Sequence, residues 1–166
     1  MALTSEIRAI VKGTQTGSND FGGSFAPNID KILQFADGTA ANQANILWAD
    51  ERTLAASATE ELDLAGVLTD AFGTTVAAAS VVAIMVTAAS ANTNNVIVTN
   101  GTAPFLLFGG TTPTFSVKPN GVMLLAAPGA GGLGTVTAVS ADQIKLTNSG
   151  AGTGVTYQIV ILARTA

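Results

Sequence analysis

Residues 75–89 read Thr-Val-Ala-Ala-Ala-Ser-Val-Val-Ala-Ile-Met-Val-Thr-Ala-Ala, an almost uninterrupted apolar run in the middle of the chain. The three consecutive alanines favour a helix, whereas the valines and the isoleucine favour a strand. A helix would be apolar on nearly all sides, so we predict a strand that bends near residues 79–80 and keep the helix as the alternative. The side chains expected to face the core are Val82, Ile84 and Val86.

This run lies inside a longer segment, Ala71 to Ala141, whose single charged residue is Lys118. Soluble monomers normally cover their surface with Lys, Glu, Arg and Asp, which are seldom fully buried unless they are paired. A segment without them either lies in the core or presents an uncharged surface of Thr, Asn, Ala and Gly. We expect such a surface to contact copies of the same chain or a larger assembly.

Turn residues divide the second half of the chain into short apolar pieces, at steps of about 8 to 12 residues. The turns are Asn100-Gly101, Gly109-Gly110, Pro119-Asn-Gly121, Pro128-Gly-Ala-Gly-Gly132 and Asn148-Ser-Gly-Ala-Gly152. This spacing is typical of an all-β sandwich or barrel. Pro113 and Pro119 bracket residues 114–117 and predict an edge strand, because proline cannot donate to a ladder of hydrogen bonds.

The C-terminal region shows the clearest alternation of apolar and polar residues. Residues 143–147 place Ile144 and Leu146 opposite Lys145, and residues 155–163 alternate through Tyr157 and Ile159 before becoming apolar on both faces. We interpret the pair as a hairpin whose second strand is central in its sheet. Residues 89–96 likewise predict a hairpin loop, leading into a strand that starts near Val96.

The N-terminal residues 1–30 are expected to form an extended arm and loop, and residues 31–166 a sandwich domain. Ile7, Ala9 and Val11 alternate with basic residues, which indicates a short strand or a terminal arm. A polar, glycine-rich loop then carries two isolated aromatic residues, Phe21 and Phe25. These either fold back on the local core or belong to an arm that holds a neighbouring subunit.

Composition excludes several classes of function. The chain carries 11% charged residues and a net charge of −4, and therefore lacks the clustered Lys and Arg that phosphate and nucleic-acid binding require. It contains neither Cys nor His, the usual thiolate, imidazole and zinc ligands. Its longest apolar run is shorter than the roughly 20 residues that span a bilayer. We expect no enzymatic activity, no cofactor, no metal, no nucleic acid and no membrane partner.

One acidic group and two glycine-rich segments were candidates for a metal, catalytic or phosphate site. Glu60, Glu61 and Asp63 lack the offsets of a calcium loop and fit the water-facing side of a half-buried strand. The glycines near 131 and 152 are not followed by the Lys-Ser/Thr pair of a phosphate loop, and we interpret both segments as turns.

Several segments resemble small structural proteins encoded among the head genes of tailed bacteriophages. They are Leu62-Asp-Leu-Ala-Gly, Leu68-Thr-Asp-Ala-Phe-Gly, Pro119-Asn-Gly before Val122-Met-Leu-Leu, and the closing Asn148-Ser-Gly-Ala-Gly with Val155-Thr-Tyr-Gln-Ile-Val-Ile. The resemblance implies a jelly-roll-like β-sandwich and a capsid decoration (cement) protein. Such a protein would be made in the host bacterial cytoplasm and would bind the outer capsid surface as a homodimer or homotrimer that clamps the major capsid protein.

Five aromatic residues are the expected assembly contacts: Phe21, Phe25, Trp48, Phe105 and Phe108. Trp48, the single tryptophan, is interpreted as either a core anchor or an interface residue. The alternative function is a phage tail, baseplate or fibre component that binds a host receptor or glycan. A third hypothesis is a polysaccharide hydrolase acting through Glu61 or Asp63. It is disfavoured because the adjacent acids Asp50/Glu51 and Glu60/Glu61 would point to opposite faces of a strand and could not converge on a substrate.

Overall fold

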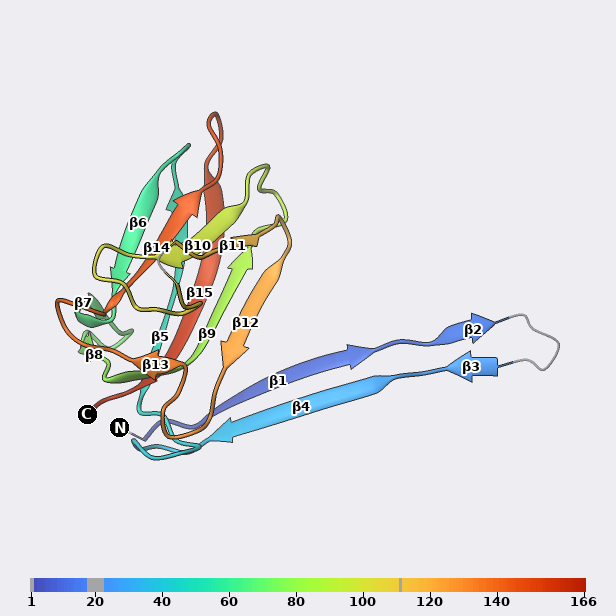
Figure 1. The fold of residues 1–166 in the computed structure, drawn as a ribbon, viewed down its shortest axis with the longest axis horizontal. Coiled ribbons are helices and arrows are strands. Elements are labelled where there is room, and N and C mark those ends of the chain that lie inside the picture. The colour runs from blue at the N-terminus through green and yellow to red at the C-terminus, as the bar shows by residue number, and fades with distance from the viewer. Residues whose placement is uncertain (1, 18–22, 111) are drawn as a thin grey trace.

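The computed structural model describes residues 2–17, 23–110 and 112–166. Within these ranges every regular element is a β-strand, which confirms the predicted all-β class. Figure 1 shows a body of packed strands from which one long hairpin projects. A membrane-spanning helix is likewise absent from these ranges.

Two antiparallel sheets form the body. Sheet I contains, in spatial order, β12 (Val122–Ala126), β9 (Ser80–Ala88), β15 (Val155–Arg164) and β5 (Ile46–Leu54), with β13 (Gly134–Thr135) beside β9. Sheet II contains β11 (Thr114–Val117), β10 (Val96–Asn100), β14 (Gln143–Asn148) and β6 (Thr59–Asp63). The short strands β7 (Ala65–Thr69) and β8 (Thr75–Ala77) pair with each other. The predicted edge strand at 114–117 is confirmed as β11.

The main core lies between the two sheets and is centred on β15. Four alternate residues of this strand are almost completely buried: Val155, Tyr157, Ile159 and Ile161. They belong to one cluster with the inward side chains of sheet II, namely Val96, Val98, Ile144 and Leu146. Since β15 lies between β9 and β5, its prediction as a central strand is confirmed.

Both predicted hairpins in the body are wrong. β14 pairs with β10 and β6, whereas β15 pairs with β9 and β5, so the loop between β14 and β15 crosses from sheet II to sheet I. The connection from β9 to β10 crosses in the same way. At the first crossing the buried Asn148 amide donates to the carbonyls of Ala55 and Thr153, at 2.9 and 2.8 Å. Alternation shows that a strand has a buried face, but not which strand lies beside it.

Residues 75–89 form strands, as predicted, with a break at Ala78 and Ala79 between β8 and β9. The expected direction of Val82 is wrong. The ladder between β9 and β15 shifts register so that Leu162 faces Ala83 while Ala163 faces Val81. Val82 is therefore the extra residue of a β-bulge, and the bulge places Val81 in the main core instead.

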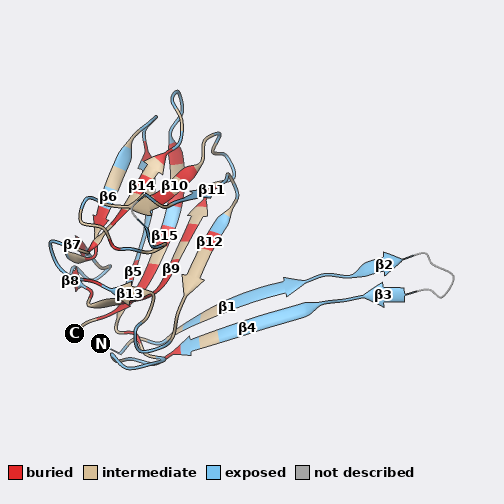
Figure 2. Ribbon diagram, in the orientation of Figure 1, coloured by how far each residue is buried: buried red, intermediate tan, exposed pale blue. Residues whose placement is uncertain are grey.

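The N-terminal hairpin consists of β1 (Ser5–Lys12) and β4 (Asn28–Phe35), continued by β2 (Gln15–Gly17) and β3 (Gly23–Phe25). It extends away from the body in Figure 1, and Figure 2 shows that most of it is exposed. The ladder continues to Phe35, so the expected boundary between residues 30 and 31 falls inside β4. Residues 18–22, which include Phe21, lie outside the described residues.

A second, smaller cluster anchors this hairpin to the body. Phe35, at the base of β4, is buried against four side chains of the body, which are Ala44, Val82, Ala83 and Leu162. We call these five residues the Phe35 cluster. It covers the face of sheet I that points away from sheet II, and it explains why β15 is buried on both faces near its end.

Arg164, the last residue of β15, is buried, and within the described residues its guanidinium forms no salt bridge with a carboxylate. Its guanidinium donates instead to the backbone carbonyls of Gln43, Pro128, Gly129 and Ala130, at 2.8 to 3.1 Å. These carbonyls belong to two loops, residues 36–45 and 127–133, and two of them also accept a backbone N–H: Pro128 from Asn42 and Gly129 from Gly132. The arginine therefore ties both loops to the end of β15.

Replacing Arg164 by Met should lower the free energy of unfolding by about 3 kcal/mol, because several buried carbonyls lose a charged donor. Urea denaturation followed by the fluorescence of Trp48, the single tryptophan, measures this. Arg8→Met is the control, since Arg8 is exposed and its ion pair with Asp30 should contribute less than about 1 kcal/mol, so its midpoint should lie close to that of the parent protein. Equal midpoints for both variants would contradict the role given to Arg164.

Candidate assembly surfaces

The structure separates the five expected assembly contacts. Trp48 and Phe105 are buried in the main core, so their side chains are not available to another chain. Phe25 is exposed near the far end of the hairpin. Phe108 is half-buried and stacks on Phe115, with 6.1 Å between the ring centroids. Phe25 and Phe108 remain within reach of a partner.

The hairpin has one apolar face, which follows directly from the register of its ladder. Residues directly opposite each other in an antiparallel pair point to the same side. The pairs on this side are Ile7 with Leu33, Ala9 with Lys31, and Val11 with Ile29. We call these six residues the apolar arm face. It is continuous with Phe35 at the base, which lies on the same side of β4.

The other face of the hairpin is mainly polar. Arg8 and Asp30 form an ion pair at 2.7 Å, and the Gln34 amide donates to Glu6 at 3.2 Å. Ile10 and Ile32 are the apolar exceptions on this side, and both are less exposed than Val11 and Ile29. These cross-strand contacts stabilise the register of the hairpin and leave its apolar face on one side.

The apolar arm face lacks a cover over most of its length. Val11 is 68% exposed and Ile29 67%. An isolated two-stranded hairpin is at best marginally stable in water. The exposed stripe therefore fits a surface that another molecule covers.

The outer face of sheet I, which points away from sheet II, is a second apolar surface. Leu47, Met85, Leu124 and Val160 lie on this face together with Leu162. A groove of about 250 Å³ runs between these side chains and β1. Among the outward positions of the four long strands, two residues are charged: Arg164, which is buried under two loops, and Glu51, whose carboxylate accepts a hydrogen bond from Gln158 at 2.8 Å.

A third surface lies at the end of the body that carries β7 and β8. Three large apolar side chains stand out into solvent there: Val67 at 70% exposure, Phe72 at 73% and Val139 at 89%. We call them the apolar loop end. Backbone hydrogen bonds from Leu64 to Asp142 and from Val136 to Ala79 link the segments that carry them, both at 2.8 Å.

Two carboxylates shape the turns of the apolar loop end. Asp70 accepts from the backbone N–H groups of Phe72 and Thr74, at 2.9 and 2.8 Å. Asp142 accepts from the N–H of Val139, whose φ of 71° is unusual for a β-branched residue. The local structure thus maintains a strained backbone that exposes Val139, and strain of this kind is a reason to suspect function.

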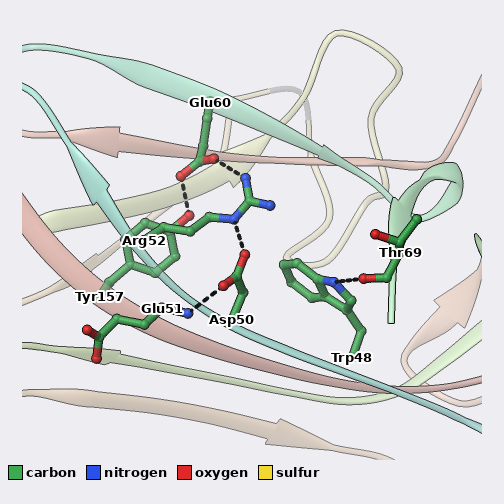
Figure 3. A network of polar contacts seen from close by, with 7 residues as sticks. All are labelled: Trp48, Asp50, Glu51, Arg52, Glu60, Thr69 and Tyr157. Atoms are coloured by element: carbon green, nitrogen blue, oxygen red, sulfur yellow. Dashed lines mark hydrogen bonds and ion pairs between the residues drawn. The ribbon is translucent and has the colours of Figure 1, made fainter. Parts of the chain in front are cut away.

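A polar network, drawn in Figure 3, joins the two sheets at one edge. Arg52 on β5 contacts Asp50 at 2.9 Å and Glu60 on β6 at 2.7 Å, and Tyr157 on β15 donates to the same Glu60. The guanidinium lies 5.5 Å from the ring centroid of Trp48. Because β5 and β6 are edge strands of opposite sheets, the network ties those edges together.

The contacts of this network indicate a structural role, which is to link the two sheets. Burial, followed by the hydrogen bond to Glu60, raises the pKa of Tyr157 far above that of an ordinary phenol. Its hydroxyl therefore stays protonated and donates to the carboxylate. The prediction that Glu60 faces water is wrong, since it contacts Arg52 and Tyr157. Glu60 is two residues from Leu62, so both side chains lie on the inward face of β6. This spacing is the sequence signal that could have predicted the position of Glu60.

The remaining acids of β6 also make contacts within the chain. Glu61 pairs with Lys145 at 2.9 Å and accepts hydrogen bonds from the N–H and hydroxyl of Thr102. The hydrogen bond from Lys145 is the main reason why the pKa of Glu61 is lowered. Asp63 accepts from the N–H of Ala65 at 2.8 Å. Over the described ranges, no three acidic residues gather as metal ligands.

Tyr157, the single tyrosine, should not ionise at its ordinary pKa of about 10 while the protein is folded. The unfolded chain loses this proton above that pH and the folded chain keeps it, so stability should fall by up to about 1.4 kcal/mol per pH unit. Near-ultraviolet absorbance of tyrosinate measures the ionisation, and fluorescence of Trp48 measures unfolding.

Tyr157→Phe is the matched control, because lysines also titrate in this range. The variant should be less stable at neutral pH by about 1 to 2 kcal/mol, but its stability should decline less steeply in alkali. Tyrosinate absorbance that appears at its ordinary pH before the fluorescence changes would contradict the buried hydrogen bond.

Sequence reasoning missed most residues of these surfaces. It identified the alternation at Ile7, Ala9 and Val11, but not the partner strand that completes the face. Val67 lies in the short strand β7 beside Gly66, and Phe72 and Val139 are isolated apolar residues in turns, so no periodicity marks them as exposed. Comparisons of this chain with protein-family models, curated proteins and solved structures found no match.

Proposed function

We propose that this chain is a structural virion protein of the capsid decoration (cement) type, with a jelly-roll-like sandwich that binds the outer surface of a phage head. Its partners are the major capsid protein and further copies of itself. The observation that carries this proposal is the apolar loop end. It exposes three large apolar side chains, and two of them lie in the nearly uncharged segment from Ala71 to Ala141.

The loop end fits a docking role on physical grounds. Exposed apolar groups contribute roughly 25 cal/mol for each Å² removed from water. A shell offers the same contact at every capsomer, so a modest contact repeated many times would brace it. A copy that touches two capsomers at once would bind more tightly, because its second contact forms at a high effective concentration.

The topology and the hairpin support the finer parts of the proposal. Successive strands often lie in opposite sheets, as in the connections β5–β6, β9–β10 and β14–β15, which suits a jelly-roll-like arrangement. The hairpin suits an extended arm that reaches a neighbouring subunit. Phe25, near its far end, is exposed in the free chain.

Phe72→Asp and Val139→Asp should each reduce binding to heads of the encoding phage that lack this protein, by at least tenfold. Each substitution puts a charge into a contact that excludes water. Co-sedimentation with such heads measures binding. Ile32→Asp is the matched control, since it adds the same charge at a half-exposed apolar position outside the loop end, and it should bind normally.

Binding to heads should also persist at 1 M salt, where the Debye length is about 3 Å and interactions between exposed charges are screened. Release of the protein by salt would indicate an ionic contact and would contradict the role of the loop end.

Cryo-EM of the parent particle decides the location. Density for this sandwich on the outside of the head is the expected result, and its absence there would overturn the proposal. Density on the tail, baseplate or fibres would favour the alternative function in host binding.

A further inference from the structure

We propose that two copies of this chain associate by exchanging their hairpins, so that the apolar arm face of each copy covers the outer face of sheet I of the other. This rests on the self-association part of the proposed function and names its surfaces. One copy carries both uncovered surfaces. A two-fold pair would therefore cover all four at once.

The two surfaces already contact each other within one chain, at the base of the hairpin. In the Phe35 cluster, a residue from the apolar side of β4 packs on Ala83 and Leu162, which lie on the outer face of sheet I. Ile7 and Leu33, the first pair of the apolar arm face, pack against the same cluster. Beyond that point the surfaces diverge, and the groove of about 250 Å³ opens between β1 and the sheet. The contact chemistry that we propose between copies is thus already present within each chain.

The charges on the two surfaces are complementary. Lys31 is the one charged residue of the apolar arm face, and Glu51 is the one exposed charged residue on the outer face of sheet I, where Arg164 is buried. Within the described ranges, neither forms a salt bridge in its own chain. Opposite charges on otherwise apolar surfaces favour one register of docking over others.

The base of the hairpin keeps the arm away from its own sheet. Phe35 is buried, the N–H of Leu3 donates to Asp37 at 3.2 Å, and the N–H of Ala36 donates to the carbonyl of Asn42 at 3.1 Å. The hairpin consequently points away from the body, as Figure 1 shows. Folding back would break these contacts, whereas docking on a second copy preserves them.

The available area is sufficient for a specific contact. The part of the hairpin beyond the Phe35 cluster runs from Ala9 on β1 to Gly17 at the end of β2, about 30 Å at roughly 3.3 Å per residue. With a ribbon about 10 Å wide, each arm covers roughly 300 Å² on each partner surface. Two arms on two sheets bury roughly 1,200 Å² in total, near the lower limit for a specific interface.

Light scattering coupled to gel filtration should show a dimer for the full chain. Ile29→Asp should shift it to monomer or weaken dimerisation at least tenfold, because Ile29 lies on the apolar arm face. Ile32→Asp, the same change on the opposite face of the same strand, should remain dimeric. A monomeric parent protein, or equal behaviour of the two variants, would overturn the proposal.

The charge pair provides a test that does not depend on the folding of a destabilised variant. Lys31→Glu and Glu51→Lys should each weaken dimerisation, and the double variant should recover it, because the opposite signs are restored. Failure of the double variant to recover would exclude this contact.

Disulfide trapping tests the geometry directly, since the chain contains no cysteine and has no background reaction. Lys31→Cys and Glu51→Cys, purified separately and mixed under oxidation, should form a covalent heterodimer. Asp30→Cys, on the opposite face, should not cross-link to Glu51→Cys. If both cysteines are placed in one chain and close a disulfide within a monomer, the arm folds onto its own sheet and the proposal fails.

These measurements are made without capsids, so they separate the two proposals. A monomer in solution that still binds heads would leave the decoration function standing and remove the arm exchange. A dimer with the expected cross-link that is found on the tail would do the opposite.

Discussion

The structure depends on covering β15, along its whole length on the inward face and at its C-terminal end on the other face. Its inward side chains meet sheet II in the main core, and Leu162 on its other side meets Phe35 from the hairpin. A strand of this apolarity costs free energy wherever either face meets water. One requirement therefore explains both the sandwich and the base of the hairpin, and the bulge at Val82 lets β9 serve both clusters.

The chain has few charged residues, and several of them make contacts inside the fold. Arg164 satisfies loop carbonyls, and the contacts among Arg52, Glu60 and Tyr157 join the edges of the two sheets. Buried polar groups are costly unless they have partners, so each of these side chains also helps to specify one arrangement of loops or sheets. The surface is left with long stretches of uncharged residues. An uncharged surface of this kind is the basis of the proposed contacts with other proteins.

The sequence predicted the class of fold and many element positions, but not the pairing of strands. Turn residues and alternation located most strands of the body, including β11 as an edge and β15 as a central strand. They did not reveal that β14 and β15 lie in different sheets, because adjacent strands with a polar loop look alike whether they pair or cross. Of the expected contact residues, Trp48 and Phe105 turned out to be core, since an aromatic side chain serves either role.

The sequence alone determined that the chain is all-β, has few charged residues and contains neither Cys nor His, because these properties depend on residue types and local periodicity. Only the tertiary structure decided which apolar residues stay uncovered. Ile29 and Lys31 join Val11 and Ala9 on one face through a ladder between segments far apart in sequence. Phe72 and Val139 come to one end of the body through long-range hydrogen bonds. Whether a side chain is exposed to solvent depends on packing between distant segments, so a local sequence pattern does not predict it.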